Sequence, residues 1–135
     1  MERILVGFDG SEGSERALNR AMMLISEHGE LILLAVIPSS KDKSLVDENA
    51  YAALKERARN LLDNVITDLG KQSFQIKSLI EEGDPSTVII DISNRLDVDL
   101  IVLGSKGQSE LGQFPIGSVA NKVVQYAAKP VMVVR

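Results

Sequence analysis

Short apolar runs alternate along the whole chain with segments in which apolar residues recur every three or four positions. The apolar runs have the length of buried strands and lie at residues 4–8, 31–37, 74–80, 100–103 and 131–134. The segments between them, at 12–28, 50–69, 85–96 and 118–127, have the periodicity of amphipathic helices. Neighbouring strands joined through helices run parallel. The alternation therefore predicts an α/β fold, with one open five-stranded parallel sheet, helices on both faces and right-handed crossovers.

Local signals mark where the predicted helices begin and end. Ser11 is placed to cap the first helix, and Gly29 stands where a glycine commonly ends one. The only histidine, His28, would then lie at the C-terminus of that helix, where its ring meets the helix dipole favourably. Asp84 is placed to cap the third helix, with Pro85 at its first position.

Two segments differ from the rest of the chain. Residues 74–81 alternate between apolar and polar side chains, which predicts a half-buried strand at an edge of the sheet. Residues 38–49 are polar and have no clear period, so we expect a surface connection there and assign it no regular structure.

The composition is that of one globular domain. The chain has 135 residues, 44% of them hydrophobic and none of them cysteine, which excludes disulfides and thiolate chemistry and suits a reducing cytoplasm. A net charge of −4 without a basic run argues against a nucleic-acid partner. The apolar runs are too short for a signal peptide or for the roughly 20 residues that cross a bilayer. We therefore expect a soluble, cytoplasmic single domain over residues 1–135, with no membrane partner and with small molecules or proteins as partners.

A glycine-rich loop lies between the fourth apolar run and the last helix. Its residues are Gly104, Ser105, Lys106 and Gly107, then nine others, then Gly117 and Ser118. Glycines let backbone amides approach an anion, and the N-terminus of the following helix adds partial positive charge. Gly117 would open the helix, the amides of Ser118 and Val119 would face a phosphate, and Lys106 would add a point charge. The loop therefore predicts a nucleotide site, although glycine and serine also serve ordinary turns and caps.

Two known phosphate-binding motifs fit the chain less well. A Walker A loop requires lysine six residues after its first glycine, but Ser118 stands at that position after Gly112. The glycines after the first strand fall at a uniform three-residue spacing, which differs from the Rossmann dinucleotide fingerprint.

The carboxyl ends of the predicted strands bring other residues to the same cleft. In an open α/β sheet, ligands bind beyond these ends. The first strand ends at Gly7, Phe8 and Asp9, the second around Val36, and the fourth at Leu103 and Gly104. Asp9 is suited to ribose hydroxyls or to a magnesium ion shared with phosphates. Phe8 flanks the cleft, and the tyrosines are expected to pack in the fold.

These residues resemble the ATP-binding branch of the universal stress protein family, whose motif is G-x2-G-x9-G-S/T. Every fixed position of that motif is present, at Gly104, Gly107, Gly117 and Ser118. The resemblance extends to residues 4–11, 83–85, 99–105 and 129–134 in the same order. It implies a Rossmann-like fold of the adenine nucleotide alpha hydrolase type, with strand order 3-2-1-4-5.

The resemblance also implies a role for each site residue. Asp9 and the backbone of Gly7 and Phe8 would contact adenosine, and Val36 would line the adenine pocket. Leu103 and Gly104 would border the ribose and the first phosphate. The triphosphate would be held by Gly107, Gly117, Ser118 and Val119, with loop amides and polar groups from Ser105, Lys106, Gln108 and Ser109.

Relatives in this family commonly form homodimers by pairing their last strands antiparallel, and the apolar segment 130–135 permits such pairing. The expected function is a cytoplasmic, ATP-binding stress-response regulator, with or without magnesium. Two alternatives stay open: a slow ATP hydrolase, which has no Walker lysine and no acidic residue beside Asp9, and a nucleotide-free dimeric scaffold.

Overall fold

The computed structural model describes residues 1–39, 48–106 and 117–135, and its strands form one parallel five-stranded sheet. The strands are β1 Arg3–Gly7, β2 Glu30–Ile37, β3 Gln75–Glu82, β4 Leu100–Gly104 and β5 Val131–Val134. Their spatial order is β3-β2-β1-β4-β5, so the predicted architecture and strand order are confirmed. The half-buried strand β3 lies at an edge, as its alternating sequence predicted.

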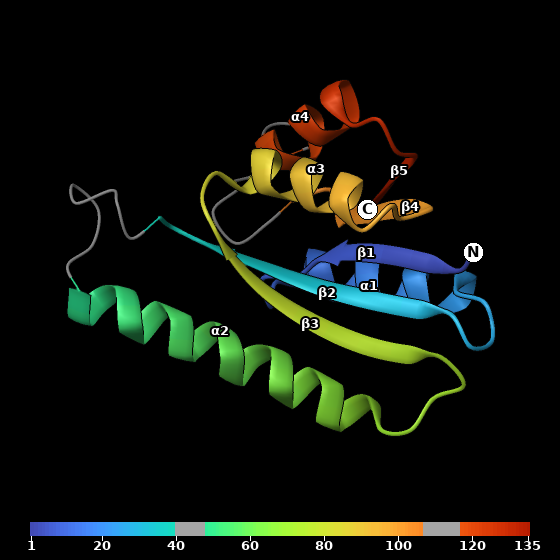
Figure 1. Ribbon diagram of the computed structural model, residues 1–135, viewed down its shortest axis with the longest axis horizontal. Coiled ribbons are helices and arrows are strands. Elements are labelled where there is room, and N and C mark those ends of the chain that lie inside the picture. Colours follow the sequence, from blue (N-terminus) through green and yellow to red (C-terminus); the bar gives the residue numbers. More distant parts are fainter. Residues whose placement is uncertain (40–47, 107–116) are drawn as a thin grey trace.

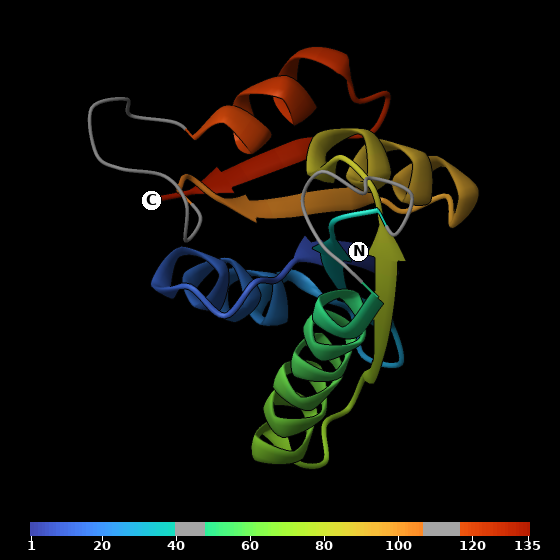
Figure 2. The same ribbon diagram turned by 90° about the vertical axis from the view of Figure 1, so that its left-hand side faces the viewer.

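Helices cover both faces of the sheet. They are α1 Glu12–Leu24, α2 Glu48–Leu69, α3 Pro85–Arg95 and α4 Ser118–Tyr126. Figures 1 and 2 show α1 and α2 together on one face, and α3 and α4 on the other. Each face has its own core: Val6 packs toward α1 and α2, whereas Leu5 packs toward α3 and α4. This burial on both sides explains why the central strands read as continuous apolar runs.

The predicted helix caps are present. The side chain of Ser11 accepts a hydrogen bond from the N–H of Ser14 at 3.2 Å and begins α1. Asp84 accepts from the N–H of Thr87 at 3.1 Å, and Pro85 occupies the first position of α3. These are local interactions, which is why the sequence signals were sufficient.

The predicted end of α1 was wrong. The helix ends at Leu24, and Ile25 is already extended. His28, rather than Gly29, has a positive φ of 64°, and its N–H donates to the carbonyl of Ser73 at 2.9 Å. After the helix, the N–H of Ser26 donates to the carbonyl of Met1 at 2.8 Å, so Ser26 and His28 both bond to distant parts of the chain instead of continuing the helix. The structure requires glycine at position 29 for a steric reason, because a Cβ there would lie 2.8 Å from the carbonyl oxygen of Ser26.

One apolar residue of α4 faces outward. Ala120 and Val123 are buried, whereas Val124 is 49% exposed. Among the described residues, no helix is both long and apolar enough to cross a membrane.

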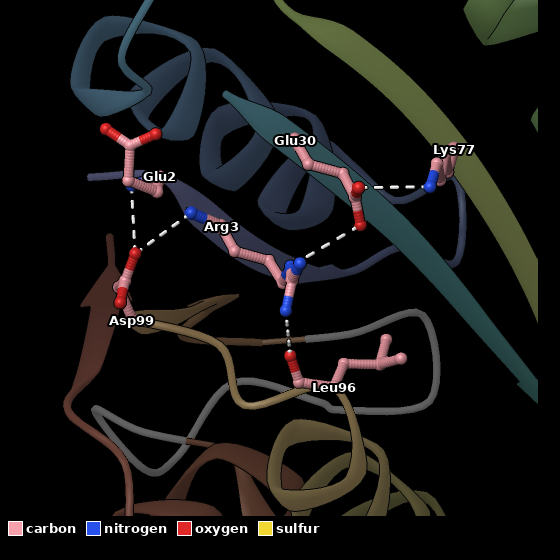
Figure 3. A network of polar contacts seen from close by, with 6 residues as sticks. All are labelled: Glu2, Arg3, Glu30, Lys77, Leu96 and Asp99. Atoms are coloured by element: carbon pink, nitrogen blue, oxygen red, sulfur yellow. Dashed lines mark hydrogen bonds and ion pairs between the residues drawn. The ribbon is translucent and has the colours of Figure 1, made fainter. Parts of the chain in front are cut away.

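A polar network joins the strands near their amino ends (Figure 3). Oδ2 of Asp99 accepts from the backbone N–H groups of Glu2 at 2.9 Å and Arg3 at 3.0 Å. Nη1 of Arg3 donates to the carbonyl of Leu96 at 2.6 Å, and its Nε lies 3.5 Å from Glu30, which also pairs with Lys77 at 3.0 Å. The network links β1, β2 and β3 to the segment that leads into β4.

Candidate functional site

A cavity of about 190 Å³ lies at the carboxyl ends of β1, β2 and β4, beside the first turns of α1, α3 and α4. Ten of the predicted site residues line it: Gly7, Phe8, Asp9, Val36, Leu103, Gly104, Ser105, Lys106, Gly117 and Val119. Segments about a hundred residues apart in sequence therefore meet at this edge of the sheet, as the topology predicted.

Of the other four predicted site residues, the structure describes only Ser118, which is not among the lining residues of the cavity. Ser118 is exposed at the start of α4. Gly107, Gln108 and Ser109 lie outside the described residues. Phe8 lines the cavity but is only 3% exposed, and its ring belongs to the core under α1 and α2. Phe8 is therefore mainly a packing residue.

The sequence reasoning missed six lining residues, which are Ser11, Ser14, Leu34, Pro85, Ile89 and Ala120. Ser11 and Ser14 follow Asp9 closely in the chain, so the β1–α1 turn was a signal for both. Pro85 and Ile89 lie on the helix that follows an edge strand, and only its crossover to β4 brings it over the end of β1.

The cavity combines apolar and polar surfaces. Leu34, Ile89 and Leu103 belong to the core under α3 and α4, and Val36 packs against that core. The polar residues come from two other segments, the β1–α1 turn with Asp9 and the chain after β4 with Lys106. Such a lining suits an amphipathic ligand, with an apolar part against β2 and α3 and a polar part elsewhere.

The β1–α1 turn holds Asp9 through local hydrogen bonds. Oδ1 of Asp9 accepts from the N–H of Ser11 at 2.9 Å, and the N–H of Asp9 donates to Oγ of Ser14 at 3.4 Å. Oγ of Ser14, which is buried, donates to the carbonyl of Ser11 at 3.0 Å. The carboxylate of Asp9 is therefore positioned by its own turn while its residue stays exposed.

The two ends of the glycine loop meet at Ser105. The carbonyl of Ser105 accepts from the N–H of Gly117, and the N–H of Ser105 donates to the carbonyl of Val134 at 2.8 Å. Gly117 is the N-cap of α4 and makes no side-chain cap hydrogen bond. A helix start of this kind presents backbone N–H groups to an anion.

Few charges line the cavity. Among its described lining residues, Asp9 is the only carboxylate and Lys106 the only cation. No group of three or more histidine, aspartate or glutamate residues that could hold a metal ion occurs in 1–39, 48–106 and 117–135.

The family model described as "Universal stress protein family" matches residues 1–135. This chain belongs to the universal stress protein family. This universal stress protein is 32% identical to universal stress protein YxiE of Bacillus subtilis (strain 168), over 98% of each chain.

Solved structures of related proteins share the fold of this universal stress protein. That of MJ0577, a universal stress protein of Methanocaldococcus jannaschii, has a TM-score of 0.88 at 33% identity, covering 98% of this chain and 94% of the other. A universal stress protein in complex with cAMP has a TM-score of 0.67 at 21% identity, over 99% of this chain and 97% of the other. At 21% identity, the similarity to the cAMP complex concerns the fold alone.

Proposed function

We propose that this universal stress protein is a cytoplasmic adenine-nucleotide-binding module, with ATP as the expected ligand, and that it acts through nucleotide occupancy. The observation that carries the proposal is one cavity that joins an apolar wall to a glycine loop ending at the N-cap of α4. A nucleotide has the same division, with a flat apolar base at one end and phosphates at the other.

The base would lie against the apolar wall. Val36 and Leu34 come from β2, and Ile89 covers them from α3. Gly7 leaves this wall open, because a Cβ there would lie 2.7 Å from Cδ2 of Leu103 and 3.6 Å from Cδ1 of Ile89. The cavity of about 190 Å³ is smaller than the roughly 300–1,000 Å³ usual for small-molecule sites, so a whole nucleotide would extend beyond it.

The phosphates would lie between Lys106 and the first turn of α4. Lys106 supplies the positive charge, and Val119 lines the cavity from the first turn of α4, where backbone N–H groups have no partner within the helix. Asp9 would accept hydrogen bonds from ribose hydroxyls, since it borders the same cavity from β1. A magnesium ion, if bound, would be held mainly by phosphate oxygens.

Binding rather than turnover is the expected activity. Efficient phosphoryl transfer uses positioned cations, metal ions and a residue that orients the nucleophile. The described lining offers one lysine and one carboxylate. We expect no ATP hydrolysis faster than about 1 per second, the low end of typical enzyme turnover. Faster phosphate release that is lost in Asp9→Asn would overturn this part of the proposal.

Titration calorimetry with Mg-ATP tests the proposal. The wild type should bind saturably, and Lys106→Ala should weaken binding about five- to tenfold by removing a charged contact to phosphate. Lys122→Ala is the matched control, because Lys122 is an exposed lysine of α4 that does not line the cavity. No heat up to millimolar ATP would refute the proposal. The chain has no tryptophan, so nucleotide retained on purification would also raise the absorbance near 260 nm.

The proposal includes a homodimer paired through β5. Residues 131–134 of β5 are all apolar and form an edge of the sheet, whereas the other edge, β3, carries Lys77, Glu81 and Glu82. Charged side chains protect an edge from pairing, and an uncharged apolar edge invites it. Because Val134 of β5 bonds to Ser105 in the cavity wall, nucleotide occupancy and dimer contacts would share one structural element.

A further inference from the structure

The first turn of α1 packs directly on the backbone of the glycine loop. Gly13, the second residue of α1, is buried, and a Cβ on it would lie 2.4 Å from the carbonyl oxygen of Lys106. A Cβ on Gly104 would lie 2.6 Å from the carbonyl carbon and the carbonyl oxygen of Gly13. Side-chain carbons do not approach other atoms this closely, so the backbone of the opposing segment leaves no room for a side chain at either glycine.

The atoms in this contact belong to the backbone. A flexible side chain could rotate away from an added methyl group at low cost, but the carbonyl of Lys106 can move only if the chain after β4 moves. Ser105 and Lys106, which begin the glycine loop, both line the cavity. The distance from Gly13 therefore sets how near the start of the loop lies to α1.

The same turn of α1 also forms part of the cavity wall. Ser11 and Ser14 line the cavity from either side of Gly13, and both bond to Asp9. One helical turn thus holds the carboxylate of Asp9 and supports the loop that carries Lys106. Helix propensity does not explain a glycine at this place, because glycine is a much poorer helix former than alanine.

We infer that Gly13 is a positioning residue of the nucleotide site: its missing side chain seats the start of the glycine loop on α1 and thereby sets where Ser105 and Lys106 meet the phosphates. The inference rests on the proposed function. It gives α1 a role in the nucleotide site, although none of the site residues expected from the sequence lies in that helix.

Gly13→Ala tests the inference. The added methyl group should push the chain at Lys106 away from α1. We expect the Kd for ATP to rise at least tenfold, while the Kd for adenosine, which has no phosphate, changes less than twofold. Calorimetry with both ligands measures the two values. A purely structural role for Gly13 would shift the two ligands together.

Two variants control for indirect effects. Glu15→Ala changes an exposed residue of the same helical turn and should leave both Kd values unchanged. Gly70→Ala strains a residue with a φ of 66° that has open space around it, far from the cavity in the chain. It should lower the thermal midpoint and leave the Kd for ATP unchanged.

The outcomes separate the inference from the proposed function. A wild type that binds no ATP refutes the proposed function and removes the basis of the inference. A wild type that binds ATP, with Gly13→Ala binding it equally well or losing ATP and adenosine equally, overturns the inference alone. If Gly13→Ala does not fold, Gly104→Ala tests the same contact from β4, and failure of both to fold assigns the contact to stability and overturns the inference.

Discussion

Asp84 illustrates how a single carboxylate begins a helix in this fold. Its Oδ2 accepts hydrogen bonds from Oγ of Ser86 at 2.7 Å, from the N–H of Thr87 at 3.1 Å and from Oγ1 of Thr87 at 3.0 Å. Hydrogen bonds to the charged form, the one from Ser86 first, hold the pKa of Asp84 below its usual value. The ionised carboxylate is therefore the form that stabilises α3.

Replacing Asp84 should lower stability in a pH-dependent way. At pH 7, Asp84→Ala should reduce the free energy of unfolding by about 1 kcal/mol, as loss of a helix cap does. A lowered folded-state pKa stabilises the fold at pH values above the unfolded value, about 3.9, and this contribution is lost as the pH falls through the lower folded-state pKa. Urea denaturation at pH 7 and near pH 3 measures both effects.

Asp84→Asn is the control for that measurement, because asparagine can cap a helix but does not titrate. The stability difference between wild type and Asp84→Asn should shrink in acid. Equal stability of wild type and Asp84→Ala at pH 7 would contradict the cap.

At the scale of secondary-structure elements, the network near the amino ends of the strands contains two kinds of interaction (Figure 3). Asp99 accepts from two backbone N–H groups at the start of β1, which fixes that strand beside the entry to β4. Lys77 and Glu30 form an ion pair between β3 and β2, with 56% of the lysine side chain and 23% of the glutamate side chain exposed. Exposed ion pairs are screened by water and contribute little.

We expect the two interactions to differ in strength. Asp99→Ala should lower the free energy of unfolding by about 1 kcal/mol, since it removes a charged acceptor from two backbone donors. Lys77→Ala should change it by less than about 0.5 kcal/mol. Chemical denaturation of both variants at low and high salt makes the comparison. A larger loss in Lys77→Ala than in Asp99→Ala would show that the ion pair dominates.

At the scale of the whole molecule, the two edges of the sheet offer different surfaces to a second copy. The carbonyls of Pro130 and Val134 accept hydrogen bonds from Ile101 and Ser105, so the backbone groups of these even-numbered residues point toward β4. Successive residues of a strand point in opposite directions, so the backbone N–H of Val133 points away from the sheet, to the unpaired side of β5. At the opposite edge, β3, the N–H groups of Gln75 and Gly83 donate to carbonyls of neighbouring residues in the sheet. By the same alternation, the N–H of Ser78 points away from the sheet. Val133 and Ser78 are therefore equivalent positions on the two edges, each with a backbone N–H that points outward.

Proline at these positions tests the proposed dimer, because it removes an outward N–H without removing an inward one. We expect the wild type to have twice the 14.7 kDa mass of one chain in analytical ultracentrifugation at micromolar concentration. Val133→Pro should shift the mass to that of one chain, and Ser78→Pro should leave it unchanged. A wild type of 14.7 kDa, or a dimer that only Ser78→Pro disrupts, would contradict pairing through β5.

Predictions from the sequence held where neighbouring residues decide the structure. The caps at Ser11 and Asp84 depend on atoms within three residues, and both are present. The end of α1 was wrong because Ser26 and His28 bond to Met1 and Ser73, which no helical periodicity reveals. The wall residue Ile89 was missed for the same reason, since its place at the cavity depends on how a crossover connects distant strands.

The sequence by itself determined which segments are strands and helices, where most of them begin, and the glycine spacing that points to a phosphate loop. These properties follow from periodicity and from contacts within a turn or a strand. The tertiary structure alone decided that α3 contributes to the apolar wall and that Gly13 lies against Gly104. Both depend on how the helices pack across the sheet. Such contacts join segments that are distant in the chain, so close packing decides them and local sequence does not.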